Sequence, residues 1–133
     1  MRSAILVVSI LIPVALLAAD QSISVDLDGD GRADVVRLET TADHVRVTVA
    51  ATSTKSTVHV DFAPPGRQQQ DSVCKYPVKL VAEKLDGCDI DGETLPGCRN
   101  SQSKWEVALE DGDCDSIRVY WDHDRKALGW WRR

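Results

Sequence analysis

Apolar and polar side chains alternate in a series of short runs along the chain. In the clearest run, residues 45–49, three valines alternate with Arg46 and Thr48. A period of two places one set of side chains on a buried sheet face and the other in solvent, as in antiparallel sheets. The runs predict strands at residues 23–27, 35–38, 45–49, 58–62, 78–82, 105–109, 117–121 and 127–131.

Turn-forming residues separate these runs. The clearest breaks are Pro64-Pro65-Gly66, Asp86-Gly87 and Asp111-Gly112-Asp113. Such residues suit turns because they supply fixed or positive backbone φ angles or local side-chain hydrogen bonds. Beyond the first nineteen residues, no helical pattern reaches ten residues. Seven to eight short strands at this spacing predict an all-β fold, a small antiparallel β-sandwich or barrel. By composition, residues 63–72 and 88–98 are expected to be loops.

The first nineteen residues have the composition of a secretory signal peptide. A positive residue, Arg2, precedes an apolar run from Ala4 to Leu17, and small alanines precede Asp20. We therefore expect a signal peptide at 1–19 and one exported domain at 20–133, periplasmic or secreted. The alternative, an uncleaved anchor, would need about 20 apolar residues to span a membrane. No membrane span is expected after cleavage. Asp20 also stands where a bacterial lipoprotein would carry Cys.

The charge of the chain restricts the class of partner. The 133 residues include 16 Lys and Arg against 21 Asp and Glu, for a formal net charge of −5. Nucleic-acid phosphates are held by Lys and Arg, so an acidic domain is a poor match and nucleic-acid binding is not expected. An acidic surface suits metal cations or a basic protein partner.

Four cysteines lie in the expected mature domain: Cys74, Cys88, Cys98 and Cys114. An even number in a small exported domain predicts two disulfides. A zinc site is the alternative, but zinc sites favour close pairs such as Cys-x-x-Cys, and these gaps are wide. Three pairings are possible. The preferred one joins Cys88 to Cys98 across a short loop and Cys74 to Cys114 across distant segments.

The most specific chemical signal is residues 26–34, in which aspartates occupy positions 1, 3, 5 and 9. Alternate residues of a tightly curled loop direct their oxygens at one centre, and Ca²⁺ takes six to eight oxygen ligands. Gly31 at position 6 permits the sharp turn. The predicted Ca²⁺ ligands are Asp26, Asp28, Asp30, the carbonyl of Arg32, and Asp34. The alternatives are a solvated acidic turn without metal, or another cation such as Mg²⁺.

This loop differs from an EF-hand, which would have Glu at position 12, where Arg37 stands. It resembles the calcium loops of integrin-type FG-GAP and VCBS repeats, whose pattern D-x-D-x-D-G-x-x-D is matched at every fixed position. The resemblance implies a loop that joins two β-strands with a metal ion bracing them. It covers one copy of about a dozen residues, and the chain is too short for the several four-stranded blades of a propeller.

Two groups of residues are candidates for binding a partner. Asp89, Asp91 and Glu93 lie between Cys88 and Cys98, where the alternative is a solvated hairpin tip. Trp130 and Trp131 lie near the C-terminus, where the alternative is a lid on the core. Exposed aromatic side chains favour glycan or protein contacts.

Catalytic patterns are missing from the sequence. The histidines, His44, His59 and His123, are scattered, and no Gly-x-Ser-x-Gly elbow, His-Glu-x-x-His helix or phosphate-binding loop is present. His123 lies between two aspartates and could serve as a general base, although a surface turn is the simpler interpretation. The sequence therefore favours a binding protein over an enzyme.

The chain as a whole is similar to small periplasmic immunity and lysozyme-inhibitor-like proteins of Gram-negative bacteria. The similarity rests on the acidic loop, the cysteines and the ending Ser116-Ile117-Arg118-Val119-Tyr120-Trp121-Asp122 … Gly129-Trp130-Trp131-Arg132. It implies an inhibitor of a peptidoglycan hydrolase. Such inhibitors use a Ser-Gly-x-x-Tyr loop, and this chain has no Ser-Gly pair. Alternative functions are a structural or adhesive cell-envelope domain, in which calcium only adds stability, and a small secreted hydrolase.

Overall fold

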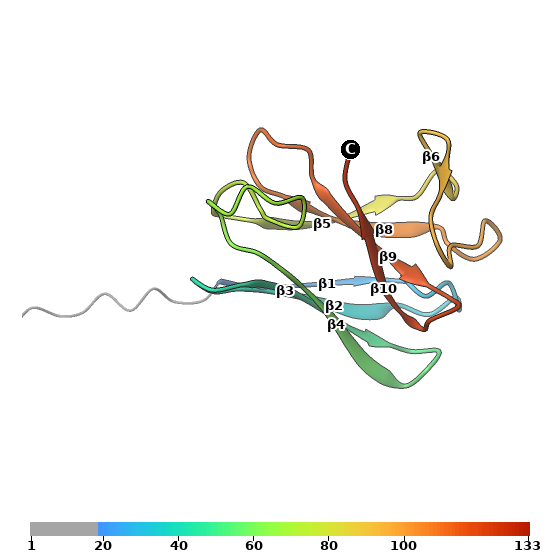
Figure 1. Cartoon of the computed structure of the whole chain (residues 1–133). Coiled ribbons are helices and arrows are strands. Elements are labelled where there is room, and N and C mark those ends of the chain that lie inside the picture. Colours follow the sequence, from blue (N-terminus) through green and yellow to red (C-terminus); the bar gives the residue numbers. More distant parts are fainter. Residues whose placement is uncertain (1–18) are drawn as a thin grey trace, which may run out of the picture.

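The computed structural model describes residues 19–133, which form two packed β-sheets (Figure 1). Residues 1–18 of the expected signal peptide lie outside the described residues. The first sheet consists of β1 (Ala19–Val25), β2 (Asp34–Thr40), β3 (Val45–Ala51) and β4 (Ser56–Phe62). The second consists of β5 (Lys79–Lys84), β8 (Trp105–Glu110), β9 (Ile117–Asp122) and β10 (Ala127–Trp131). A small hairpin adds β6 (Asp89–Ile90) and β7 (Glu93–Thr94).

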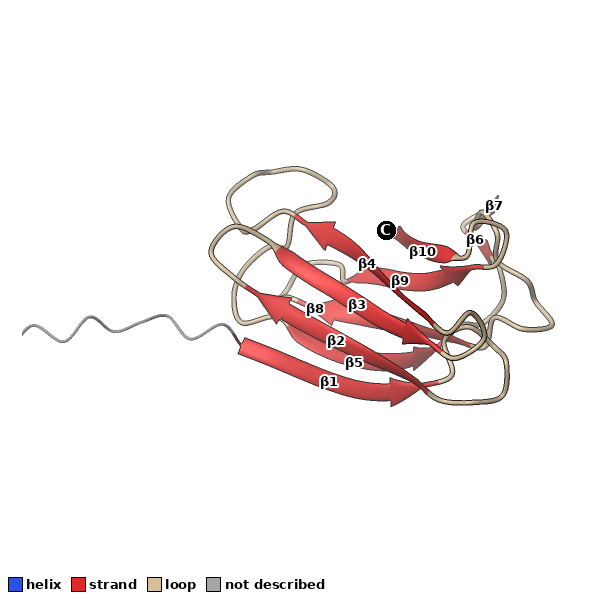
Figure 2. Ribbon diagram, turned by 90° about the horizontal axis from the view of Figure 1, so that it is seen from below, coloured by secondary structure: helices blue, strands red, loops and turns tan. Residues whose placement is uncertain are grey.

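Both large sheets are antiparallel, with strand orders β1-β2-β3-β4 and β10-β9-β8-β5. Figure 2 shows the two layers from below, with β1 close to β5 and β4 close to β10. The prediction of an all-β antiparallel sandwich is confirmed, and residues 19–133 contain no helix. All eight predicted strands are present. The two extra strands lie in residues 88–98, for which no strand was expected.

The inward side chains of both sheets form the core. In the first sheet their alternation is the one that predicted the strands, because the inner face is buried and the outer face is more exposed. In the second sheet, β8 and β9 are buried on both faces. Complete burial of a Val, Leu or Ile side chain contributes about 1.5–3 kcal/mol, so this cluster supplies much of the free energy of folding. Its fully buried members include Val36, Leu38, Val45, Val47, Val49, Val107, Leu109, Ile117 and Val119.

A glutamine side chain joins the two sheets at one edge of the sandwich. The Gln21 side-chain amide on β1 donates to the Val78 carbonyl at 2.6 Å and accepts from the Leu80 amide at 2.9 Å. These bonds satisfy main-chain groups of the β5 edge that would otherwise lack partners. Gln21 therefore links the two sheets through the side chain of one edge strand.

The chain crosses from β4 to β5 around one end of the sandwich. Val73 and Val78 of this connection are buried in the core, and the disulfide Cys74–Cys114 joins it to the β8–β9 loop. The Arg132 guanidinium donates to the Ser72 carbonyl at 2.7 Å and to the buried Asp111 carboxylate at 3.2 Å. The expected loop at 63–72 is thus closely attached to the C-terminal segment.

The long segment between β5 and β8 folds over the outer face of the second sheet. Leu85 and Leu95 pack against Tyr120 in a second apolar cluster, and the Tyr120 hydroxyl donates to the Pro96 carbonyl at 2.9 Å. Gly129 permits this packing, since a Cβ there would lie 2.5 Å from the Tyr120 ring. The disulfide Cys88–Cys98 closes the base of the small hairpin. The expected disulfide pairing is confirmed for both bonds.

Candidate metal centre

The acidic loop connects β1 to β2 at the end of the sandwich opposite the β4–β5 connection (Figure 2). The predicted first strand ends earlier than expected, at Val25, because the Leu27 amide turns back to donate to the Val25 carbonyl at 2.9 Å. Two glycines allow the curl. Gly29 and Gly31 have φ angles of 72° and 86°, where L-residues are strained. Gly29 also has no room for a side chain, since a Cβ would lie 2.4 Å from the Gln102 carbonyl oxygen.

Asp34 is the anchor of the loop. Its carboxylate is completely buried, and Oδ2 accepts from the amides of Leu27 at 2.8 Å and Asp28 at 3.0 Å. The other oxygen, Oδ1, accepts from the Thr52 amide at 2.8 Å and the Thr52 hydroxyl at 3.1 Å. Thus one side chain at the start of β2 organises both the acidic loop and the β3–β4 turn.

Asp28 makes a second connection to the same turn. It is buried, and its Oδ2 accepts from the Ser53 amide at 2.9 Å, while Oδ1 accepts from the Asp30 amide at 3.2 Å. Thr52 and Ser53 were not among the residues expected at this site. Because these contacts depend on the packing of two separate hairpins, the spacing of residues in the sequence gave no signal for them.

Asp26, Asp28 and Asp34 form the candidate site. One carboxylate oxygen from each lies within 4.8 Å of the others. Asp26 Oδ2 accepts from the Gly31 amide at 2.9 Å, whereas its Oδ1 is buried and has no hydrogen-bond partner. A buried carboxylate oxygen without a donor is costly, and neighbouring carboxylates increase that cost by repulsion. This oxygen-only donor set could hold a metal ion.

Asp30 has a different environment from the other three aspartates. Its carboxylate accepts from the Arg32 amide at 2.8 Å, the Thr52 hydroxyl at 2.9 Å and the Arg32 guanidinium at 3.0 Å. Burial alone would raise the pKa of Asp30, but these hydrogen bonds hold that pKa below its ordinary value. Asp30 is therefore already paired with the Arg32 guanidinium. The roles of Asp30 and of the Arg32 carbonyl as metal ligands stay predictions.

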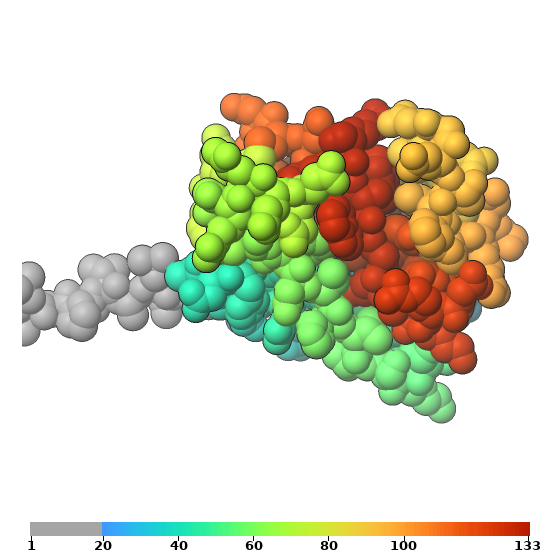
Figure 3. Space-filling view, viewed as in Figure 1, coloured from blue at the N-terminus to red at the C-terminus, as the bar shows by residue number. Residues whose placement is uncertain are grey.

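Four of the five expected partner-binding residues line one groove. Asp91, Glu93, Trp130 and Trp131 all border it, between the β6–β7 hairpin and the end of β10. Asp89 does not, and its carboxylate accepts from the Thr94 hydroxyl across the hairpin. The disulfide-closed hairpin and the C-terminal strand lie side by side in Figure 3, in gold and dark red.

The two tryptophans point to opposite faces of β10. The Trp130 ring packs edge-on against Phe62 of the core, with centroids 5.8 Å apart. The Trp131 indole nitrogen donates to Glu106 Oε2 at 3.0 Å, and Arg118 lies over its ring at 5.3 Å. Trp130 thus contributes to the core edge, as the alternative interpretation of a lid expected, while Trp131 belongs to the outer face. Glu106 and Arg118 were not identified from the sequence.

The three histidines lie in different parts of the fold, in the β2–β3 turn, in β4 and in the β9–β10 turn. His123 lies in the β9–β10 turn, its amide donates to the Gly97 carbonyl at 2.9 Å, and its buried Nε2 has no partner. Burial, followed by the nearby charge of Arg99, lowers the pKa of His123 below its ordinary value. His44 contacts Thr41 within the β2–β3 turn and Glu39 near the end of β2.

Within residues 19–133, no helix is long and apolar enough to cross a membrane. Comparison of the chain with protein-family models, with curated proteins and with solved structures finds no match. A fold class such as a β-sandwich supports many unrelated functions, so the function has to be argued from the site itself.

Proposed function

We propose that this chain is an exported calcium-binding module that binds a protein partner and inhibits a peptidoglycan hydrolase. The observation that carries the calcium part is the buried Asp26 Oδ1, which has no donor and lies beside two further carboxylates. A divalent cation would supply the missing positive charge. It would also brace the two strands that the loop joins, as the FG-GAP and VCBS resemblance implies.

The chemistry of the donors favours calcium. Asp26, Asp28 and Asp34 offer only oxygen, which suits hard cations and not zinc or copper. Asp30 and the Arg32 carbonyl would add to the shell in the arrangement expected from the loop pattern. Mg²⁺ demands a smaller and stricter octahedral shell with several waters, whereas the loop offers closely spaced carboxylates.

Calorimetry tests this part of the proposal. Titration of the mature protein with Ca²⁺ is expected to give one saturable site, and Asp26→Asn is expected to remove it. Asp61→Asn is a matched control, because Asp61 is exposed and pairs with Arg46 far from the loop. The absence of binding at millimolar Ca²⁺, or equal binding by both variants, would overturn the calcium proposal.

Export and a basic partner are supported by the covalent and charge properties of the domain. Two disulfides persist in oxidising compartments such as the periplasm. A net charge of −5 steers association with basic proteins, a common property of hydrolases that act on anionic cell walls. A scaffold held by two disulfides would present its loops at low entropic cost.

Inhibition is tested with a panel of basic peptidoglycan hydrolases, with Ca²⁺ and with a chelator. The proposal expects slower cell-wall lysis by at least one hydrolase at stoichiometric inhibitor, and weaker inhibition after chelation. If no hydrolase in the panel is slowed in either condition, the inhibitor proposal fails while the calcium proposal stands on its own titration.

A second candidate is a structural or adhesive cell-envelope domain. It is favoured by the fact that Asp28 and Asp34 connect only segments of this domain, so the ion would stabilise the fold whatever the partner. Recovery of a surface component from cell-envelope extract, with no hydrolase, would support this candidate. A third candidate, a small secreted hydrolase, would require turnover that is lost in His123→Ala.

A further inference from the structure

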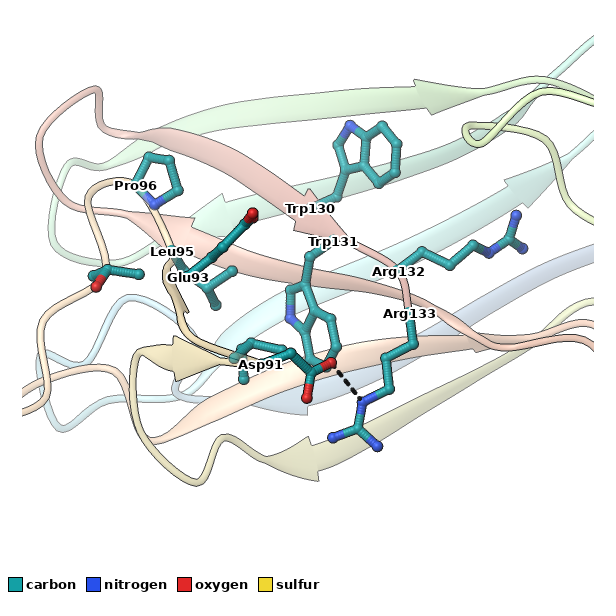
Figure 4. Close-up of a pocket in the computed structure, with 10 residues that line it drawn as sticks. Asp91, Glu93, Leu95, Pro96, Trp130, Trp131, Arg132 and Arg133 are labelled. Carbon is teal, nitrogen blue, oxygen red and sulfur yellow. Dashed lines mark ion pairs between the residues drawn. The ribbon is translucent and has the colours of Figure 1, made fainter.

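The groove beside the β6–β7 hairpin, here called the hairpin groove, is a shallow site of about 330 Å³. Leu95, Pro96 and the indole of Trp131 provide its apolar surface. The hairpin adds Asp91, whose carboxylate lies beside the indole and faces Arg133, and Glu93, which points in a different direction (Figure 4). This volume is at the lower end of the roughly 300–1,000 Å³ typical of ligand pockets. An open groove of this size suits a protruding side chain better than an enclosed metabolite.

The aromatic surface of the groove is held rigidly. The indole nitrogen of Trp131 donates to Glu106, whose buried carboxylate also accepts from the Arg118 guanidinium at 2.7 Å. Arg118 on β9 in turn pairs with Glu83 on β5, across the intervening β8, and lies over the indole ring. Because the ring orientation is already determined, a ligand that packs on it loses little conformational entropy of the protein.

Two carboxylates, Asp91 and Glu93, line the groove together with the Arg133 guanidinium, which a ligand could displace. Arg133 pairs with Asp91 at 3.6 Å, and their side chains are 67% and 71% exposed. An exposed pair of this length contributes at most about 1 kcal/mol. Glu93 has no ion pair among the described residues. Arg132, although it borders the groove, points away from it in Figure 4 and is held by Asp111.

The Asp91 carboxylate beside an indole, with Glu93 on the same hairpin, matches the chemistry of an extended cationic side chain. The charged end would form charge-assisted hydrogen bonds with Asp91, in the place that Arg133 now takes. The aliphatic stem would lie on Leu95 and Pro96, as long cationic side chains do on apolar surfaces. A sugar would gain from the indole but would leave the acidic charge of Glu93 uncompensated.

We propose that the hairpin groove receives an Arg or Lys side chain from a basic protein partner, and that Arg133 occupies this position in the free protein. The inference rests on the proposed function only for the existence of a protein partner. The Asp91–Arg133 pair breaks on binding, and the partner's cation replaces the guanidinium of Arg133. Arg133 thus competes with the partner and weakens its binding.

The probe is an amidated tetra-arginine peptide, added to the mature protein and followed by the NMR signal of the Trp131 indole N–H. Asp91→Asn/Glu93→Gln is expected to weaken binding about tenfold, equivalent to about 1.4 kcal/mol. The matched control is Asp86→Asn/Asp113→Asn, which removes the same charge from exposed positions outside the groove. It is expected to change the affinity less than about twofold, since distant surface charges are screened by salt.

Arg133→Ala provides an independent readout, because removal of a competitor is expected to tighten peptide binding about threefold. The proposal fails if the two acidic double variants weaken binding equally, or if Arg133→Ala weakens it. It also fails if chito-oligosaccharide shifts the Trp131 signal and the peptide does not, which would identify a glycan site. Hydrolase assays on the same variants separate the two proposals, since the peptide can bind the groove whether or not any hydrolase is inhibited.

Discussion

Asp34 and Thr52 are the residues through which the acidic loop and the β3–β4 turn are joined. The Thr52 amide and hydroxyl donate to Asp34 Oδ1 at 2.8 and 3.1 Å, although the two residues are separated by 18 positions. Since the other Asp34 oxygen serves Leu27 and Asp28, this carboxylate satisfies donors from two hairpins at once. Asp34 therefore stabilises the fold whether or not an ion is bound.

Asp34→Asn is expected to destabilise the domain by about 2–4 kcal/mol even in the presence of a chelator. An amide has a single acceptor oxygen, so its NH₂ group would face donors that the second carboxylate oxygen now satisfies. Urea denaturation with EDTA measures the change. Asp61→Asn, which removes an exposed pair with Arg46, should cost no more than about 1 kcal/mol. Equal losses in the two variants would contradict the anchoring role of Asp34.

Calcium is expected to raise the melting temperature of the mature protein. A ligand that binds only the folded state at 100 times its dissociation constant adds about 2.7 kcal/mol of stability, which corresponds to a shift of several degrees. Asp26→Asn should remove the shift, because it removes the buried oxygen that lacks a donor. Differential scanning calorimetry with Ca²⁺ and then EDTA measures both effects. Retention of the full shift by Asp26→Asn would argue against this site.

The strands of the first sheet could be predicted because only one of its faces is buried. In β3 the buried positions are apolar valines and the more exposed positions are the polar Arg46 and Thr48. The sequence itself therefore shows this alternation. The hairpin β6–β7 could not be identified in this way, since its two-residue strands are too short to alternate. It forms around Asp91 and Gly92, both at positive φ, and is closed by the disulfide Cys88–Cys98.

The candidate site was predictable in its spacing but not in its surroundings. The loop pattern brings Asp26, Asp28 and Asp34 together, as expected from their positions. It does not reveal that Arg32, two residues from Asp30, pairs with that carboxylate. Likewise, the Glu106 contact with Trp131 depends on how strands β8, β9 and β10 lie in register, which no local pattern records.

The two disulfides are expected to contribute unequally to stability. Cys74–Cys114 spans 40 residues and Cys88–Cys98 spans 10. In the chain-entropy model a longer closed loop restricts the unfolded chain more, which gives about 4 kcal/mol for the first bond and about 3 kcal/mol for the second. Urea denaturation of the Cys74→Ser/Cys114→Ser and Cys88→Ser/Cys98→Ser variants measures the difference. A larger loss from the short loop would mean that the hairpin contributes through its contacts with Tyr120.

Glu106 is expected to make the stability of the domain depend on pH. Burial raises the pKa of Glu106 above its ordinary value, although the hydrogen bonds from Arg118 and Trp131 act in the opposite direction. The folded protein therefore holds this proton more tightly than the unfolded chain. The resulting stabilisation is complete below the ordinary pKa of glutamate and is lost as the pH rises through the folded-state pKa.

Glu106→Gln lacks this titration, so its stability relative to the unsubstituted protein should increase as the pH rises from acidic to neutral values. Urea denaturation at a series of pH values measures the difference between the two proteins. The Trp131 indole N–H signal should titrate over the same range in the unsubstituted protein only, since that group donates to Glu106. A stability difference that stays constant with pH, together with an indole signal that does not move, would show that Glu106 remains ionised throughout and is held so by Arg118.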